Sequence, residues 1–160
     1  MNKLGIFAVI LGVTLGLMMP TGQSRAPSVQ AAAAVTRSST PVETRIRRSE
    51  NGHFYVHGMV NGQLVRFLVD TGATGVALTA TDAERTGVSF SPRNFEVVGT
   101  GASGAVRGQV VRLDSVDVDG KVASNVPAAV LEGLEISLLG QSYLSQLASV
   151  EMSGDYMVLR

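Results

Sequence analysis

The first apolar stretch of the chain runs from Leu4 to Met19 and contains no charged residue. As a helix it would span about 24 Å, somewhat less than the ~30 Å hydrocarbon core of a bilayer. This length is typical of a signal-peptide core or a short uncleaved anchor, and a buried core helix is a third interpretation. Prolines at positions 20 and 27 disfavour cleavage nearby. Residues 1–20 are therefore predicted to be a single-pass anchor in the cell membrane. The alternative is a cleaved signal peptide and a secreted or periplasmic product.

Residues 21–44 are rich in Ala, Ser, Thr and Pro and contain no aromatic residue, no Ile and no Leu. Such a segment has too little apolar surface to offset the conformational entropy that folding would cost. We therefore predict a flexible linker. It would join the membrane segment to a folded, exported domain that spans residues 45–160.

From residue 45 onward, short alternating segments are separated by turn residues. The clearest signal is Asn61-Gly62 between His53–Val60 and Gln63–Val69. Asn-Gly favours the type I′ turn of a β-hairpin, because that turn needs positive φ at both central residues. Phe67–Val69 is apolar on both faces, which predicts a central, buried strand at the end of the hairpin.

The rest of the domain also has strand-like periodicity, with two short helices. Further strands are predicted at Phe95–Val98, Ala105–Leu113, Val116–Val118, Ala128–Leu131 and Tyr156–Leu159. Thr81–Glu84 is a capping box that predicts the start of a helix, and Gly87 suits the position after its end. Gln141–Ala148 predicts a two-turn helix with Leu144 and Leu147 facing inward. Together these patterns predict an all-β, barrel-like domain.

Charge is distributed unevenly along the chain. Residues 1–50 hold six basic and two acidic residues, whereas residues 51–160 hold seven basic and eleven acidic ones. The excess of acidic residues in 51–160 argues against a nucleic-acid-binding groove, because such a groove needs clustered positive charge. The chain has no cysteine, which excludes a disulfide scaffold, thiolate catalysis and cysteine-type zinc or iron–sulfur sites.

Asp70 is the candidate for chemistry. It stands where the apolar run Phe67–Val69 passes into Thr71–Thr74, a turn that contains Gly72. The glycine lets backbone N–H groups approach the carboxylate, and Thr71 and Thr74 offer hydroxyl donors beside it. A carboxylate held in this way suits a general base. Taken alone, the tripeptide Asp70-Thr71-Gly72 favours the simpler interpretation of an Asx turn at a strand end.

Other motifs in the chain favour a catalytic role for Asp70 over a simple Asx turn. After the Asp-Thr-Gly turn come a Gly-rich segment between two predicted strands, Gly99–Gly104, and then Ser137–Leu144. In this order, with Asn61-Gly62 before the turn, the motifs resemble the retropepsin-like aspartic peptidases. The similarity is greatest to the small exported bacterial members with one N-terminal membrane segment. The resemblance extends from about Gly52 to Arg160 and implies a closed retropepsin-like β-barrel.

The resemblance assigns roles to individual residues. Asp70 would be the catalytic aspartate, Thr71 the residue that locks two active-site loops together, and Gly72 the residue that completes the loop. Ala73 and Thr74 would continue this loop, and the hydrophobic–hydrophobic–Gly element beneath it would be Leu138, Leu139 and Gly140. The flap over the substrate would consist of Val98, Gly99, Thr100, Gly101, Ala102, Ser103 and Gly104. No Tyr occurs in this flap, unlike in pepsin-type flaps.

Asp-Thr-Gly occurs once in the chain and Asp-Ser-Gly does not occur. Aspartic-peptidase chemistry needs two carboxylates about 3 Å apart that share one proton. The resemblance therefore implies an aspartic endopeptidase that cleaves polypeptides as a homodimer, with one Asp70 from each subunit, no metal and no cofactor. The alternative is a non-catalytic, exported protein-binding module on the same barrel.

The resemblance also places Arg45–Arg48 and Tyr156–Arg160 near the dimer interface. On that basis we expect removal of Tyr156–Arg160 to weaken the dimer before it damages the barrel.

Other motifs are explained better by structure than by chemistry. Gly99-x-Gly101-x-x-Gly104 fits a dinucleotide fingerprint, but the residues that follow favour a strand instead of the required helix. His53 and His57 would lie about 13 Å apart on a strand, too far to share a metal ion. Ser103 and Ser142 lack the full context of a hydrolase nucleophile. The acids Asp114, Asp117 and Asp119 are predicted to form a solvated face, not a calcium site.

Overall fold

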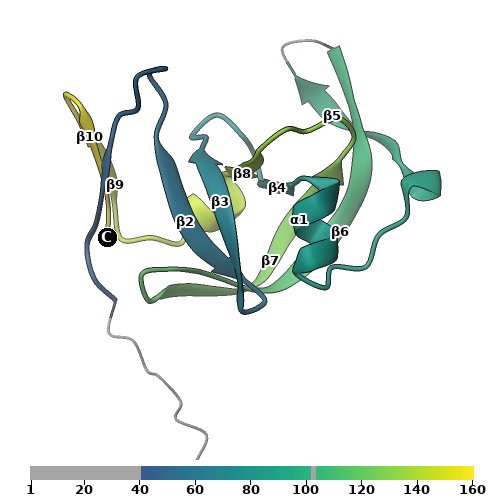
Figure 1. Cartoon of the computed structure of the whole chain (residues 1–160), viewed down its shortest axis with the longest axis horizontal. Coiled ribbons are helices and arrows are strands. Elements are labelled where there is room, and N and C mark those ends of the chain that lie inside the picture. The colour runs from purple at the N-terminus through teal and green to yellow at the C-terminus, as the bar shows by residue number, and fades with distance from the viewer. Residues whose placement is uncertain (1–40, 102–103) are drawn as a thin grey trace, which may run out of the picture. The chain divides into compact units, whose positions relative to one another are not determined.

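The computed structural model describes residues 41–101 and 104–160 (Figure 1). Its strands are β1 (Thr44–Arg47), β2 (Tyr55–Val60), β3 (Gln63–Val69), β4 (Val76–Leu78), β5 (Glu96–Gly101), β6 (Gly104–Val118), β7 (Lys121–Leu131), β8 (Ser137–Leu139), β9 (Val150–Ser153) and β10 (Tyr156–Leu159). Its helices are α1 (Ala80–Arg85), the 3₁₀ helix η1 (Pro92–Asn94) and α2 (Gln141–Leu144).

Seven of these strands form a barrel. Their order is β2-β3-β8-β4-β7-β6-β5, and β2 also pairs with β6, which closes the sheet. Strand β8 lies between β3, to which it is parallel, and β4, to which it is antiparallel. The prediction of an all-β closed barrel with two short α-helices is confirmed for the described residues.

The β2–β3 hairpin forms as predicted. Its turn residues Asn61 and Gly62 have φ values of 49° and 79°, as a type I′ turn requires. Along β2 and the residue before it, Phe54, Val56 and Val60 are buried. Strand β3 pairs with β2 on one side and β8 on the other, so the strand that leads to Asp70 is central.

Strand β6 is one continuous element where the sequence predicted two. Its inward residues pass from Leu113 to Val116, both fully buried, so the alternation slips by one position at Asp114–Ser115. On the facing strand β7, Asn125 has a φ of 54° at the same level. This one-residue shift in the inward-facing positions made the sequence pattern look like a break between two strands. The strand in fact continues past Asp114–Ser115 and pairs with β2.

Both α-helices differ from the prediction at one end. The N-cap of α1 is Thr79, whose Oγ1 accepts a 3.0 Å hydrogen bond from Asp82 N, so the predicted capping box at Thr81 is two residues too late. The predicted glycine after α1, Gly87, has a φ of 71°. Helix α2 ends at Leu144 instead of Ala148, because the N–H of Ala148 bonds to the carbonyl of Arg160 (2.7 Å) and draws the chain toward β10.

A second sheet joins the two ends of the domain. Its order is β1-β10-β9, with β10 antiparallel to both neighbours. Met157 and Leu159 of β10 are 1% and 0% exposed and belong to the same hydrophobic core as Ile46. Removing Tyr156–Arg160 would delete the middle strand of this sheet and two core side chains, so the deletion would cost stability of the domain as well. Whether the dimer weakens first stays a prediction.

The predicted membrane segment and most of the linker, residues 1–40, lie outside the described residues. In the part of the chain that the structure describes, no helix is long and apolar enough to cross a membrane.

Candidate active site

The strand order brings the two most specific sequence motifs together. Strands β3 and β8 run parallel and side by side, so the residues that follow them meet at one edge of the barrel. Asp70 follows β3 and Gly140 follows β8. The N–H of Asp70 bonds to the carbonyl of Leu139 at 3.1 Å, which ties the two strand ends to each other.

The Asp70 carboxylate is oriented by backbone donors. Its Oδ1 accepts hydrogen bonds from the N–H groups of Gly72 (2.9 Å) and Ala73 (3.2 Å). The side chain is half-buried, which leaves the carboxylate in reach of a bound molecule. Thr71 and Thr74 were expected to supply hydroxyl donors to this carboxylate. Within the described residues, their hydroxyls make no hydrogen bond to Asp70, and both threonines are exposed.

The first turn of α2 holds the loop after Asp70 in place. Gln141 N donates to Ala73 O at 2.9 Å, and Ser142 N donates to Thr74 O at 3.1 Å. Two side chains add to these bonds: Gln141 Nε2 donates to Thr71 O at 2.8 Å, and Ser142 Oγ accepts from Val76 N at 2.9 Å. Ser142 therefore supports the loop through its hydroxyl group.

Gly140 lies between this helix and the loop. A Cβ at position 140 would lie 2.2 Å from Gly75 O and 2.7 Å from Ala73 O, so a side chain cannot be placed there without moving the loop. Leu139 beside it is fully buried, and Leu138 pairs with Leu68 of β3 and Ala77 of β4. The predicted Leu138-Leu139-Gly140 element thus lies directly against the Asp70 loop.

A cleft of about 360 Å³ opens beside the loop. Of the predicted residues, it is lined by Ala73 and Thr74 of the loop, by Leu138, and by Val98, Gly99 and Thr100 of β5. Gly101 and Gly104 pair with each other at the end of the β5–β6 hairpin, where the flap was predicted, and Ala102 and Ser103 lie outside the described residues. Strands β5 and β6 project beyond the rest of the barrel in Figure 1.

Sequence reasoning missed the other walls of this cleft. They are formed by Gly75, Val76, Ala77, Val106, Val110, Pro127, Ala128, Ala129, Leu131 and Ser142. Most are apolar, and Val110 is 66% exposed. The available sequence signal was the adjacent pair Val110-Val111, which places an apolar side chain on each face of β6.

Residues 56–146 match the family described as "gag-polyprotein putative aspartyl protease". The chain belongs to the retropepsin-like aspartic protease family. A crystal structure of a retropepsin-like aspartic protease from Rickettsia conorii is 34% identical to this chain. The alignment covers 74% of this chain and 89% of that one, with a TM-score of 0.62.

Two curated relatives of this retropepsin-like chain are named as uncharacterized proteins. One, encoded in the cobV 5′ region of a Sinorhizobium species, is 35% identical over 131 residues, which cover 81% of this chain and 56% of the relative. The other, from Rickettsia prowazekii strain Madrid E, is 36% identical over 118 residues, covering 73% and 51%. The chain therefore spans about half the length of the curated relatives that it matches.

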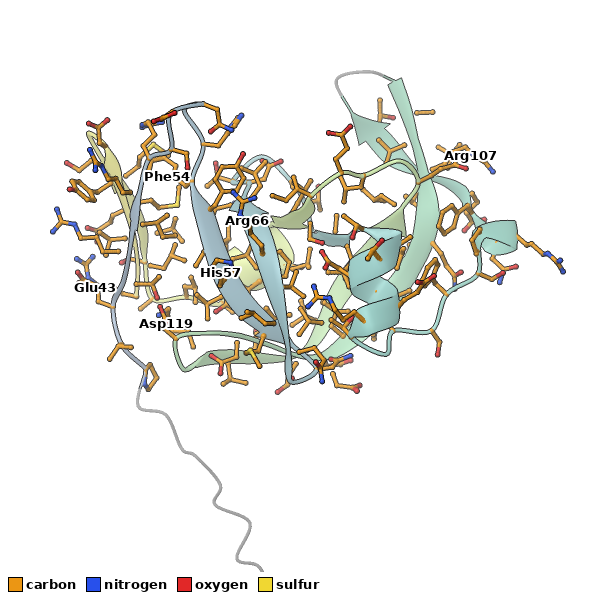
Figure 2. The ribbon with its side chains drawn as sticks, viewed as in Figure 1. Glu43, Phe54, His57, Arg66, Arg107 and Asp119 are labelled. Atoms are coloured by element: carbon orange, nitrogen blue, oxygen red, sulfur yellow. The ribbon has the colours of Figure 1, made fainter. Side chains whose placement is uncertain are left out.

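Among the residues that the structure describes, the competing motifs do not assemble into a second site. His57 lies on the exposed face of β2 beside Arg66 of β3 (Figure 2). Residues 41–101 and 104–160 contain no group of three or more His, Cys, Asp or Glu side chains that could hold a metal ion. The segment after the Gly-rich turn is strand β6, so the helix that a dinucleotide fingerprint requires does not form there.

Proposed function

We propose that this retropepsin-like domain is an aspartic endopeptidase whose active form is a homodimer with one Asp70 from each subunit. The observation that carries the proposal is the fixed geometry of Asp70. Backbone N–H groups orient the carboxylate. Close packing at Gly140 and hydrogen bonds from Gln141 and Ser142 hold the loop after Asp70 in place. The chain has both the backbone donors to Asp70 and the residues that fix its loop. This is expected of a catalytic domain, in which the carboxylate must be held in one orientation.

The reaction follows from two such carboxylates about 3 Å apart that share one proton. The ionised Asp70 takes a proton from a water molecule as the water oxygen attacks the scissile carbonyl carbon. The protonated Asp70 of the other subunit donates a hydrogen bond to the carbonyl oxygen and stabilises the developing charge. The proton that the first Asp70 took from water then passes to the amide nitrogen. The C–N bond breaks, and the amine product leaves.

The proposed substrate is an extended polypeptide in the cleft beside the loop. The flap strand β5 lies at the edge of the barrel sheet and offers backbone groups to such a peptide. Alanine, valine, leucine and proline side chains make up most of the walls of the cleft, so we expect a preference for apolar residues on either side of the cleaved bond.

The direct test is cleavage of an unbiased peptide library across a range of pH by the wild type and by Asp70→Asn. We expect cleavage that is strongest at acidic pH, because the mechanism needs a shared proton, and no cleavage by Asp70→Asn. Asp114→Asn, which changes an exposed acid on β6, is the matched control and should retain activity. Full activity in Asp70→Asn, or loss of wild-type activity with a chelator, would contradict the aspartic mechanism.

We also propose that the domain is exported and held at the membrane by residues 1–20. Support comes from the uncharged run Leu4–Met19 and from the composition of residues 21–44. Confinement to a membrane would raise the effective concentration of a weak dimer. Alkaline carbonate extraction of membranes from cells that express the full chain would test this. The chain should stay in the pellet, and release of the full-length chain would contradict anchoring.

A further inference from the structure

A second cleft, of about 870 Å³, lies outside the Asp70 site. Its walls come from the end of β1 and the loop that follows it, from Tyr55 of β2, from Arg66 of β3 and from Asp155 between β9 and β10. None of these residues lines the cleft beside Asp70. Arg66 lies on the exposed face of the β2–β3 hairpin (Figure 2). The proposed peptidase activity therefore leaves this second cleft without a role.

Arg66 is held in place by an aromatic ring. Its guanidinium carbon lies 4.3 Å from the centre of the Tyr55 ring. Tyr55 is fixed in turn, because its hydroxyl oxygen accepts a 2.8 Å hydrogen bond from Asn51 Nδ2 and the His53 ring packs edge to face against it, with centroids 6.3 Å apart. A guanidinium group stacked in this way loses little freedom when it binds an anion.

Arg47 supplies a second cation to the same cleft, from the exposed face of β1. In the part of the chain that the structure describes, the guanidinium groups of Arg47 and Arg66 make no hydrogen bond and no ion pair. Arg48 differs, because its Nη1 and Nη2 donate to the carbonyls of Gly52 (2.9 Å) and Gly154 (3.1 Å). Arg48 therefore shapes the loop, whereas Arg47 and Arg66 keep their donors for a ligand.

Two guanidinium groups and two hydroxyl groups favour a phosphate group as the ligand. A carboxylate is planar and one guanidinium fork can satisfy it, whereas a tetrahedral phosphate accepts hydrogen bonds from several directions. Ser49 and Tyr55 line the cleft, and each can donate its hydroxyl proton. The cleft thus offers a phosphate both charged and neutral donors.

Two acidic residues restrict the kind of phosphate that the cleft can take. Glu50 and Asp155 also line it, and Asp155 Oδ1 lies 3.8 Å from Arg48 Nε. Their negative charge disfavours a polyanion such as a nucleic acid and suits a ligand that carries a cation next to its phosphate. A primary ammonium group is such a cation and donates hydrogen bonds to a carboxylate. Phosphate and ammonium occur together in the ethanolamine headgroup of a phospholipid.

We propose that this cleft binds a phospholipid headgroup at the membrane surface, with the phosphate on Arg47 and Arg66 and a primary amine on Glu50. The inference rests on the proposed anchoring by residues 1–20. Residues 20–44 would then keep the domain within about 90 Å of the bilayer. At that distance the effective concentration of headgroups is high, so that a weak site is sufficient to orient the domain on the membrane.

Fluorescence quenching in lipid nanodiscs tests the proposal. The chain has no tryptophan, so Tyr156→Trp introduces a single reporter opposite Arg47 in the β1–β10 pair. The full-length variant is placed in nanodiscs of dibrominated phosphatidylcholine, alone or mixed with phosphatidylethanolamine or phosphatidylglycerol. Phosphatidylethanolamine should roughly double the quenching, and phosphatidylglycerol, which has no amine, should add less. Equal quenching in the three lipids, or the strongest in phosphatidylglycerol, would overturn the proposal.

A reporter far from the cleft is the control for this measurement. Val97→Trp changes an exposed residue on β5, which lies on the opposite side of the domain from β10 in Figure 1. Its quenching should not depend on the lipid. The same lipid dependence at both positions would show non-specific adsorption and overturn the proposal.

Charge variants in the Tyr156→Trp background test the individual residues. Arg47→Gln with Arg66→Gln should abolish the effect of phosphatidylethanolamine and weaken binding of soluble phosphoethanolamine, read from the reporter's emission, at least tenfold. Arg93→Gln with Arg112→Gln removes the same charge from two exposed arginines elsewhere and should change neither. Equal losses in the two double variants would contradict a site at Arg47 and Arg66.

Glu50→Gln tests the amine contact separately from the phosphate contact. It should remove the preference for phosphatidylethanolamine over phosphatidylcholine while binding of inorganic phosphate is retained. An unchanged preference would contradict the assignment of the amine to Glu50.

Soluble probes distinguish the lipid from other ligands. Phosphoethanolamine in solution should relieve the quenching that phosphatidylethanolamine causes. Binding of phosphoethanolamine without any effect of the lipid would overturn the bilayer as the source of the phosphate. A response of the reporter to a tetraglutamate peptide, but not to phosphoethanolamine, would overturn the phosphate itself.

These readouts separate the inference from the proposed anchoring, and none of them depends on peptide cleavage. A chain that stays in the nanodiscs without lipid-dependent quenching would support the anchor and overturn the headgroup site. A full-length chain that alkaline carbonate releases, but that still sediments with phosphatidylethanolamine vesicles and not with phosphatidylcholine vesicles, would support the site and contradict the anchor.

Discussion

Gly140 and Gly75 approach so closely that a single methyl group on Gly140 would lie 2.2 Å from the carbonyl oxygen of Gly75. This contact joins the strand pair β3–β8 to the loop that carries Asp70. The loop position is therefore set by backbone packing as well as by hydrogen bonds. A substitution at Gly140 should affect the site before it affects the barrel.

Gly140→Ala should displace the Asp70 loop. A shift of about 1 Å in a catalytic group can cost roughly 10²-fold in rate, and overpacking of this kind costs about 1–3 kcal/mol of stability. Peptide cleavage and urea unfolding measure the two effects. Gly99→Ala is the control for stability, since a Cβ there meets no atom within 4 Å. Activity in Gly140→Ala equal to that of the wild type would show that the loop is not held by this contact.

Ser142→Ala should weaken the same loop by a different route. The N–H of Val76, a residue that is 1% exposed, would lose its acceptor. An unsatisfied buried donor costs about 1–3 kcal/mol in the free energy of unfolding. Ser145→Ala removes the hydroxyl of an exposed serine at the end of α2 and should change stability by less than about 0.5 kcal/mol. Equal stability losses in the two variants would contradict a specific role for Ser142.

Alkaline stability should depend on Tyr143, whose ring is fully buried and whose hydroxyl donates to Lys121 O at 2.6 Å. Burial raises the pKa of Tyr143 well above its usual value of 10. The native state therefore keeps the phenol proton at pH values where the unfolded chain has lost it. The stabilising effect of the phenol is complete below about pH 10 and is lost as the pH rises further.

Urea unfolding of the wild type and Tyr143→Phe from pH 7 to pH 11 checks this prediction. Above pH 10 the wild type should lose up to about 1.4 kcal/mol per pH unit relative to Tyr143→Phe. Burial also lowers the pKa of Lys121, but this lysine is present in both proteins and its effect cancels to first order. Parallel pH profiles for the two proteins would contradict the assignment.

The parts of the fold that the sequence predicted well have strong local signals. The Asn61-Gly62 turn needs positive φ, and Phe67–Val69 has no polar face to expose, so both could be recognised without tertiary information. Strands β4, β8 and β9 have three or four residues each, which is too short for alternation to be visible. The α1 cap was misplaced because Thr79 and Thr81 are equally good caps, and the end of β4 decides between them.

The site was predicted at the level of its motifs but not of its contacts. Asp70 and Gly140 could be proposed from the motif order, whereas their proximity depends on the parallel pairing of β3 with β8. The donors to the Asp70 carboxylate are backbone groups and not the threonine hydroxyls that the sequence suggested. Which groups face the carboxylate depends on the path of the loop, and that path is set by Gly140 and Ser142 from a distant part of the chain.

The proposed homodimer requires each chain to supply half of one active site. It is tested most directly by mixing the wild type with a ninefold excess of Asp70→Asn and measuring peptide cleavage per wild-type chain. Random pairing would leave only about one-tenth of the wild-type chains in dimers with two competent carboxylates, so activity per wild-type chain should fall to about one-tenth. An equal mass of serum albumin in place of Asp70→Asn should have no effect. Activity per wild-type chain that stays constant as Asp70→Asn is added would contradict the account.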